Sequence, residues 1–160
     1  MSHRMKHGSS IPGRALSGHP GPTATASVTM RANRGRDTGP ELALRRALHA
    51  RGLRYRVDHP LPFDRRRRAD VLFTRAKVAV FVDGCFWHGC PEHGTTPRTN
   101  ARFWSDKIGR NRARDADTTA RLEAAGWVVL RFWEHDDPDR AAADVARAVM
   151  HATRRDRAGH

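Results

Sequence analysis

The sequence is poor in the features that mark secreted and membrane proteins. It has only two cysteines in 160 residues and no secretory signal, so a disulfide-stapled extracellular domain is not favoured. No apolar run reaches the roughly 18 residues that a membrane-spanning helix needs, and there is neither a lipidation motif nor an internal repeat. These absences favour a reduced, intracellular protein.

Acidic residues are scarce relative to basic ones. The chain has 17 Asp and Glu against 30 Lys and Arg, a net charge of +13, and a pI near 11.5. Such an excess predicts a polyanionic partner, and without a membrane segment nucleic acid is favoured. Only Lys6, Lys77 and Lys107 are lysines, and the other basic residues are arginines. Genomic base composition can produce this preference for arginine, so we draw conclusions from the net charge and not from the arginine content.

The length predicts one domain with short ends. Residues 1–29 are rich in Ser, Gly, Pro, Thr and His and lack helical periodicity, so we expect a disordered or tag-like tail. A single domain is predicted over residues 30–153, followed by a frayed basic C-terminus at residues 154–160.

Apolar periodicity predicts the order helix, three strands, helix, strand, helix. The expected elements are a helix from Thr38 to Gly52, strands at 53–57, in the second half of 65–73 and at 77–82, a helix over 100–125, a strand over 127–133, and a helix from Pro138 to about Thr153. Three consecutive strands can form a meander, and the long helix is a crossover that makes the last strand parallel to a neighbour. The fold class is therefore α/β, with a mixed sheet flanked by helices.

The stretch KVAVFVDGCFWHGCPEH, residues 77–93, is the chemical centre of the chain. Its first part is a continuous apolar run typical of a buried strand. A carboxylate, two thiols, two histidines and two adjacent aromatics follow at once. Open α/β sheets place their chemistry at the carboxyl ends of strands, so we expect the functional site here.

The spacing Cys85-x4-Cys90-x2-His93 provides three of the four ligands of a structural zinc site. His135 is the best candidate for the fourth, because it follows strand 127–133 and parallel neighbours end at one edge of the sheet. Such sites supply on the order of 10 kcal/mol to folding. The alternative is two buried thiols with incidental histidines.

A second constellation predicts hydrolysis of phosphodiesters. Asp70 and Asp83 end consecutive strands and can hold Mg²⁺, with the backbone carbonyl of Val82 as a further ligand. His88 could take a proton from the attacking water or give one to the leaving oxygen. Glu41 could reach the ion through water.

Each of these carboxylates also has a plainer interpretation. Asp70 could pair with the arginines at 65–68, which would then be a solvated charge run. Glu41 could be an ordinary acidic residue in the first turn of its helix, where it favours the positive end of the dipole.

The adjacent aromatics Phe86 and Trp87 cannot both enter a core easily. They could pack around the zinc loop, or they could insert between base pairs with help from Trp104. Lys107 and Asn111 share a helical face with Trp104.

Taken together, several motifs resemble the very short patch repair (Vsr) DNA mismatch endonucleases. They are RDTGPELALRRALHARGLRYR, RADVLF, VFVDGCFWHGCPEHG, TN-x2-FW-x2-K-x3-N, RD at 114–115 and GWVVLRFWEH, in order from about residue 30 to 135. The resemblance implies a restriction-endonuclease-like (PD-(D/E)XK-type) fold, Mg²⁺-dependent hydrolysis and structural Zn²⁺. It also implies nicking 5′ of the thymine in a T:G mismatch left by deamination of 5-methylcytosine.

Carried over by position, the resemblance implies three groups of residues. Catalysis falls to Asp70, Glu41, Asp83 and His88, zinc binding to Cys85, Cys90, His93 and His135, and DNA contact to Phe86, Trp87, Trp104, Lys107, Asn111 and Asp115. One departure is that Cys85 stands where the wider nuclease superfamily has a Lys, so His88 would replace that lysine. Another is Asp83, which stands at a position where the resemblance implies His in a family member.

The resemblance extends to partners and location. Double-stranded DNA with a T:G mismatch is the expected substrate, beside mismatch-repair proteins and a cytosine-5 methyltransferase system, and we expect a monomer acting at the nucleoid in the bacterial cytoplasm. The alternatives are a restriction-like nuclease of other specificity and a non-catalytic, zinc-stabilised DNA-binding protein. The number of catalytic metals, the flanking bases and the direction of proton transfer at His88 stay open.

Overall fold

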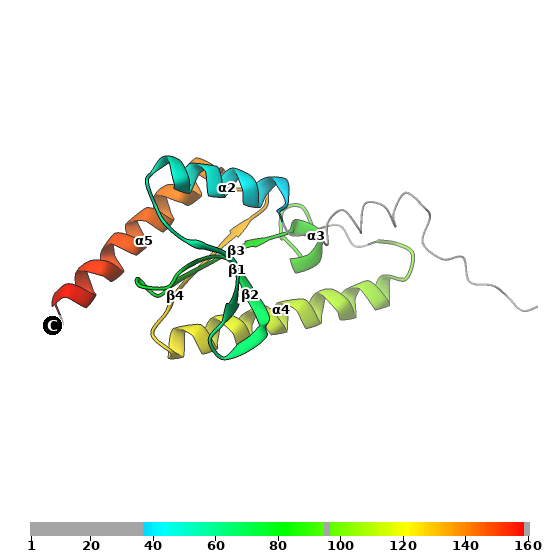
Figure 1. Ribbon diagram of the computed structural model, residues 1–160. Coiled ribbons are helices and arrows are strands. Elements are labelled where there is room, and N and C mark those ends of the chain that lie inside the picture. Colours follow the sequence, from blue (N-terminus) through cyan, green and yellow to red (C-terminus); the bar gives the residue numbers. More distant parts are fainter. Residues whose placement is uncertain (1–36, 95–96, 159–160) are drawn as a thin grey trace, which may run out of the picture. The chain divides into compact units, whose positions relative to one another are not determined.

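A mixed four-stranded sheet lies between two layers of helices (Figure 1). The computed structural model describes residues 37–94 and 97–158, so the expected tail at 1–29 lies outside the described residues. The elements are α2 (Gly39–Ala50), β1 (Arg56–Leu61), β2 (Asp64–Phe73), β3 (Val78–Asp83), α3 (Cys85–His88), α4 (Ala101–Ala124), β4 (Val128–Trp133) and α5 (Pro138–Ala158).

The strand order β1-β2-β3-β4 confirms the expected topology. β1, β2 and β3 form an antiparallel meander, and β4 runs parallel to β3 with Val78 opposite Val128 and Asp83 opposite Trp133. The connection from β3 to β4 passes through α3 and α4. Because β3 and β4 are parallel, both carboxyl ends lie at one edge of the sheet.

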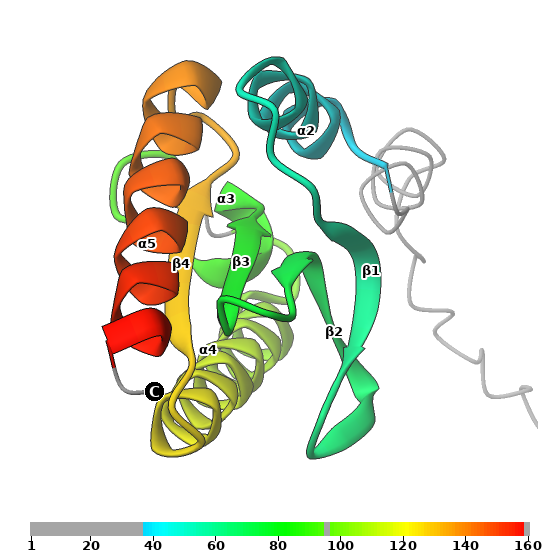
Figure 2. The same ribbon diagram turned by 60° about the vertical axis from the view of Figure 1, so that its left-hand side comes forward.

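Alternation along the strands builds two cores. Val78 and Val80 of β3 pack with α2 and α5, whereas Ala79 and Phe81 face the other way and pack with Leu122 of α4. Figures 1 and 2 show α2 and α5 side by side over one face of the sheet and α4 across the other. Each fully buried Val or Leu side chain contributes about 1.5–3 kcal/mol, which anchors the strands that carry the site.

Four boundaries differ from those that the sequence predicts. β1 spans Arg56–Leu61 and includes Pro60, because an edge strand tolerates a residue that donates no ladder hydrogen bond. β2 includes all of the arginine run from Arg65 to Arg68. α5 continues to Ala158, so the frayed end expected from 154 is helical as far as the described residues go. Residues 85–88, expected as loop, form the short helix α3.

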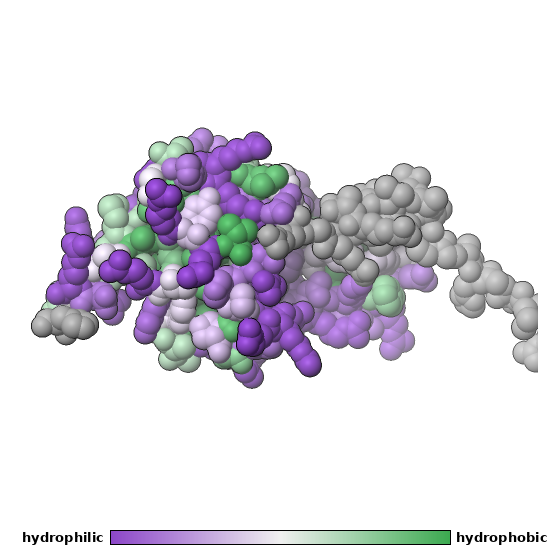
Figure 3. Space-filling model, viewed as in Figure 1, coloured by the Kyte–Doolittle hydropathy of each residue, from purple (hydrophilic) through white to green (hydrophobic). Residues whose placement is uncertain are grey.

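Hydrophilic residues cover most of the face seen in Figure 3, and apolar residues are scattered among them. Phe103 of α4 is one of the few large apolar side chains on the surface of the described residues, with 53% of it exposed. None of the helices in the described ranges is both long enough and apolar enough to cross a membrane.

Candidate active site and metal centre

β2 and β3 separate next to Asp70. The paired positions run from Phe73 and Val78 to Val71 and Val80. Beyond this point the N–H of Val82 donates to Asp70 Oδ2 at 2.7 Å instead of to a ladder carbonyl. The carboxylate is therefore inserted where the two strands part, at the edge of the sheet that carries residues 83–88.

The Asp70 carboxyl group is destabilised in its charged form. Burial raises its pKa from the ordinary 3.8 to about 6, the Val82 N–H opposes the rise, and the charges of Glu41 and Asp83 add to it. A divalent cation would offset both the desolvation cost of the Asp70 carboxylate and its repulsion by Glu41 and Asp83, because both costs apply only to the negatively charged form. The donor chemistry thus fits a hard ion such as Mg²⁺ at Asp70.

Arg67 and Arg68, from the run that precedes Asp70, pair with other residues. Arg67 binds Asp117 and Thr118 of α4, at 2.6 and 2.8 Å, and Arg68 binds Asp58 at 2.7 Å. Pairing between the arginine run and Asp70, the plainer interpretation of this segment, is thus not what the structure shows.

The position of Glu41 is compatible with both a helix-start carboxylate and a residue of the catalytic group. It is buried, and its carboxylate accepts from the Thr38 hydroxyl, the Asp37 N–H and the Arg45 guanidinium, which are contacts of a helix start. It is also near enough to raise the pKa of Asp70. Its contact with an ion through water stays a prediction.

Asp83, the last residue of β3, is held by an arginine from β4. Arg131 Nε and Nη2 donate to the two carboxylate oxygens of Asp83 at 2.7 and 2.6 Å, and Nη2 also lies 3.2 Å from Asp115 Oδ1. His88 Nδ1 lies 3.8 Å from Asp83 Oδ1. Asp83 therefore joins a network with His88 and Asp115, and the two predicted Mg²⁺ ligands Asp70 and Asp83 have different surroundings.

His88 is oriented by Asp115 of α4. Its Nδ1–H donates to Asp115 Oδ2 at 2.5 Å, which leaves Nε2 as the nitrogen that exchanges protons. Burial lowers the pKa of His88, but the bond to Asp115 and the charges of Asp83 and Asp115 outweigh it, so the net pKa is raised. Burial raises the pKa of Asp115, but His88 and Arg131 outweigh it, so Asp115 is held ionised. Asp115, predicted as a residue near DNA, is thus a hydrogen-bond partner of the candidate catalytic histidine.

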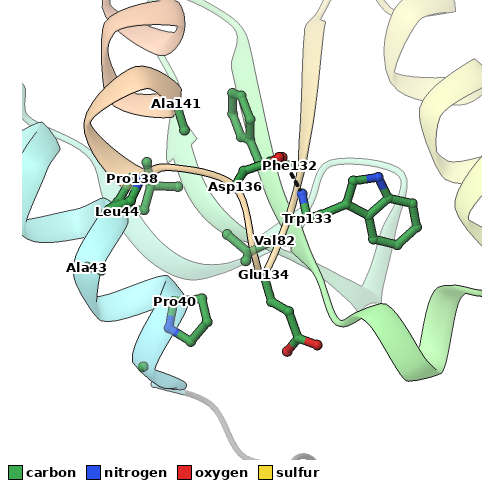
Figure 4. A pocket seen from close by; sticks show the side chains of 11 residues that line it. Pro40, Ala43, Leu44, Val82, Phe132, Trp133, Glu134, Asp136, Pro138 and Ala141 are labelled. Atoms are coloured by element: carbon green, nitrogen blue, oxygen red, sulfur yellow. Dashed lines mark hydrogen bonds between the residues drawn. The ribbon is translucent and has the colours of Figure 1, made fainter. Parts of the chain in front are cut away.

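These groups surround an open hollow of about 260 Å³. It is lined by Asp83, His88, Arg112, Asp115, Arg131, Phe132 and Trp133. A second hollow of about 180 Å³ lies between α2, α5 and the ends of β3 and β4 (Figure 4). Most of its lining residues, such as Pro40, Leu44 and Ala141, are apolar, so the first hollow is the better site for phosphate chemistry.

The predicted zinc ligands Cys85, Cys90, His93 and His135 converge. One ligand atom from each lies within 4.8 Å of all the others. Cys85 Sγ is 3.1 Å from His135 Nδ1, and Cys90 Sγ is 3.9 Å from His93 Nδ1. Tetrahedral zinc, with bonds of about 2.0–2.3 Å, brings its ligand atoms to similar separations. Both cysteines are free and buried, so no disulfide competes, and the donor set fits zinc.

The short helix α3 determines the local geometry of the predicted zinc loop. It starts after Gly84 and ends at Gly89, whose φ of 63° turns the chain back so that the Cys90 N–H donates to the Cys85 carbonyl at 2.9 Å. Glu134, which the sequence analysis did not select, accepts from the Cys85 N–H at 2.8 Å and ties the loop to the end of β4.

The aromatics form one cluster between α3 and α4. Ring centroids of Phe86, Trp87 and Trp104 lie 5.0–6.1 Å apart, and Lys107 Nζ lies 5.3 Å from the Trp87 ring and 5.7 Å from the Trp104 ring. Asn111 donates to the Trp87 carbonyl at 3.0 Å. The three rings are only partly buried, so the cluster packs against itself and also keeps exposed area, and its role in DNA recognition stays a prediction.

Arg131 is another site residue that the sequence analysis missed. It is the one charged residue in VVLRFW, an otherwise apolar strand. A charge at such a position needs a partner, and parallel pairing places Arg131 beside Phe81, one same-face position before Asp83. That signal was readable once the register of β4 against β3 was known.

Comparisons with known proteins identify the family of this chain. The family model described as DNA mismatch endonuclease Vsr matches residues 22–93. The chain is 47% identical over 136 residues to the type II nicking enzyme V.NaeI of Lentzea aerocolonigenes, covering 83% of this chain and 82% of that protein. It is 46% identical over 109 residues to the type II nicking enzyme V.NmeDIP of Neisseria meningitidis serogroup C, covering 67% and 72%.

A further relative carries the family's own name. The DNA mismatch endonuclease Vsr of Escherichia coli K12 is 40% identical over 116 residues, which cover 69% of this chain and 70% of that protein. Identities of this size over most of both chains identify the family, whose members are endonucleases that act on DNA. The chain therefore belongs to the Vsr DNA mismatch endonuclease family.

Proposed function

We propose that this protein nicks one strand of duplex DNA 5′ of the thymine in a T:G mismatch, by Mg²⁺-assisted hydrolysis. The observation that carries the proposal is the partly buried Asp70 carboxylate, whose charge is opposed by Glu41 and Asp83 and which binds the Val82 N–H near the end of β3, the strand that α3 and His88 follow. The names of the relatives, nicking enzymes and a mismatch endonuclease, support the same reaction.

Asp70, with the backbone carbonyl of Val82, would hold Mg²⁺. The ion would supply Lewis-acid activation of the phosphodiester and of water. In the reaction, a water oxygen forms a bond to phosphorus and the bond from phosphorus to the leaving oxygen breaks.

His88 is assigned the proton that the leaving oxygen needs. Its raised pKa favours the protonated form, and its Nδ1–H is committed to Asp115, so Nε2 is the atom that gives up the proton. Arg112 lines the same hollow, and its positive charge would draw the phosphate toward it.

Mismatch recognition is assigned to the aromatic cluster of Phe86, Trp87 and Trp104. The Trp87 Nε1–H is buried and has no acceptor among the described residues, which costs about 1–3 kcal/mol. A rearrangement that lets the rings stack on bases would offset this cost, and a mismatch is easier to unstack than a matched pair. Lys107 and Asn111 already contact Trp87 of the cluster, so we assign them to DNA contacts beside it.

A structural zinc at Cys85, Cys90, His93 and His135 completes the proposal. It would join the end of β3 to the end of β4, since three ligands follow β3 and the fourth follows β4. This link would keep α3, with its aromatics and His88, in a fixed position on the sheet.

The test is a strand-specific nicking assay with Mg²⁺. Duplexes that carry one T:G mismatch in varied contexts are compared with matched T:A and C:G duplexes, and an Asp70→Ala protein is the blank. We expect nicks only 5′ of the mismatched thymine, and no nicks with Asp70→Ala although it still binds the duplex. Equal cutting of matched duplexes would mean that the protein is a nuclease that does not recognise mismatches.

A second assay separates recognition from chemistry. Trp104→Ala should lower affinity for the mismatched duplex by about 5- to 150-fold, the equivalent of about 1–3 kcal/mol of lost stacking. Affinity for the matched duplex should change little, and Trp127→Ala, altered away from α3, serves as the control. Equal losses on both duplexes would contradict a mismatch-specific wedge.

A further inference from the structure

Asp83, His88 and Asp115 have the composition of a divalent-metal site. One ligand atom from each lies within 4.8 Å of the others, and all three residues line the hollow of about 260 Å³. Two carboxylates and an imidazole at such separations would ordinarily attract Mg²⁺ or Mn²⁺.

A positive charge already lies in this cluster. The Arg131 guanidinium donates to both oxygens of Asp83, at 2.7 and 2.6 Å, and approaches Asp115 Oδ1 to 3.2 Å. The remaining oxygen, Asp115 Oδ2, accepts from His88. All four carboxylate oxygens of the cluster therefore have a donor from the protein.

The guanidinium suits this position better than an exchangeable ion would. Its planar fork of N–H donors can bridge two carboxylates and cannot be deprotonated in proteins. It also lies over the Phe81 ring, 4.7 Å from the centroid, which adds a cation–π contact on its other side. Removing it would leave two partly buried carboxylates without compensation, at a high cost.

We propose that Arg131 is a built-in cation that occupies the place of a second metal ion, so that the Asp83–His88–Asp115 cluster binds none. This inference rests on the proposed function and deepens it. Asp83 accepts hydrogen bonds from Arg131 and does not bind Mg²⁺, which is held at Asp70. Arg131 is then a positioning residue, which fixes Asp115 and through it the orientation of His88.

Metal binding to the free protein tests the proposal without any DNA. Mn²⁺, a paramagnetic substitute for Mg²⁺, is titrated into zinc-loaded protein and free Mn²⁺ is measured by electron paramagnetic resonance. We expect wild type and Asp83→Asn to bind the same number of Mn²⁺ ions. If Asp83→Asn abolished a site that wild type has, Asp83 would be a metal ligand and the proposal would be overturned.

Removing the built-in cation should create the missing site. Arg131→Met keeps a similar length without charge, and it should bind one more Mn²⁺ than wild type. The gain should vanish in the double variant Arg131→Met with Asp83→Asn, and Arg147→Met on the exposed side of α5 is the matched control. No gain in Arg131→Met that is folded by circular dichroism would contradict the idea that Arg131 fills a cation site.

Kinetics provide a readout that a merely structural residue would not affect. Arg131→Ala should lower the single-turnover rate on the order of 10²-fold through a misplaced His88, with little change in KM. Guanidinium ion at millimolar concentration should restore part of the rate, whereas sodium ion should not. A change in KM alone, or no rescue, would count against the positioning role.

The two hypotheses can fail separately. If the protein failed to nick T:G duplexes yet Arg131→Met gained a Mn²⁺ site through Asp83, the proposed function would be wrong and the inference about Arg131 would stand. If nicking occurred and Asp83 bound Mn²⁺ in wild type, only the inference would be lost.

Discussion

Two clusters of ligating side chains meet at the carboxyl ends of β3 and β4, and they differ in how their charge is balanced. In the Cys85–Cys90–His93–His135 cluster, cysteines and histidines approach one another within 4.8 Å. In the Asp83–His88–Asp115 cluster, Arg131 lies between the carboxylates. The first is suited to a bound ion, and the second has its cation from the chain itself.

The difference follows from the chemistry of the ligands. Thiolates and imidazoles match zinc, and burial raises the pKa of the Cys85 thiol to about 12, with Cys90 and Glu134 adding to the rise, so without an ion the group stays protonated. Carboxylates are ionised at neutral pH without help and form strong bidentate bonds with arginine. Similar spacing of ligand atoms thus leads to different occupants.

The largest effect should come from removing one thiol. Cys90→Ser should lose the bound zinc, and with it much of a contribution on the order of 10 kcal/mol, so the domain should unfold or melt far lower. Zinc content and thermal melting measure this. A strong chelator should lower the melting temperature of wild type toward that of Cys90→Ser, and freshly purified wild type without zinc would contradict the prediction.

The next effect concerns the other cluster. His88→Ala should lower the single-turnover nicking rate by about 10²- to 10⁴-fold while duplex affinity persists, because a proton donor is lost. His49→Ala and His151→Ala, both exposed on helices, are matched controls. If His88 acts as the acid, the wild-type rate should fall as pH rises through its raised pKa; a rate that rises instead would make it the base.

The raised pKa of Asp70 should make the stability of the protein depend on pH. Its pKa is raised from 3.8 to about 6, so the folded state holds a proton that the unfolded state releases, which corresponds to about 3 kcal/mol. The free energy of unfolding of wild type should therefore fall as pH rises from about 4 to 6, whereas that of Asp70→Asn should not.

The measurement is urea unfolding of both proteins across that range in buffer without Mg²⁺. Above pH 6, Asp70→Asn should be the more stable protein, and below pH 4 the difference should disappear. Mg²⁺ should stabilise wild type alone. A pH-independent difference between the two proteins would mean that Asp70 titrates normally.

The smallest effect concerns Gly89, which lies between His88 of one cluster and Cys90 of the other. Gly89 has a φ of 63°, and a Cβ there would lie 3.0 Å from Ile108 Cγ2, so Gly89→Ala should destabilise by about 1–3 kcal/mol. Gly109 in α4 has open space around a Cβ, so Gly109→Ala should stabilise by about 0.5–1 kcal/mol. Thermal melting of the pair checks the opposite signs.

Local patterns were sufficient for the element order and for three of the four predicted zinc ligands, whose binding of zinc stays a prediction. The apolar run before Asp83 is typical of a buried strand. The thiols and His93 are close in sequence, so their convergence needs little tertiary information, whereas His135 joins them through the parallel pairing of β4 with β3. Boundaries were less determined: β1 includes Pro60 because it is an edge strand, a property of the sheet rather than of the segment.

Contacts across the sheet were decided by the tertiary structure. Sequence alone determined that carboxylates, a histidine and aromatics follow β3, and that the chain is strongly basic. It could not determine that Asp115 binds His88 or that Arg131 binds Asp83, because these partners are distant in sequence and are brought together by the parallel register of β4 and the packing of α4. Charge balance in a buried site depends on which groups meet in space, and that is settled only when the layers assemble.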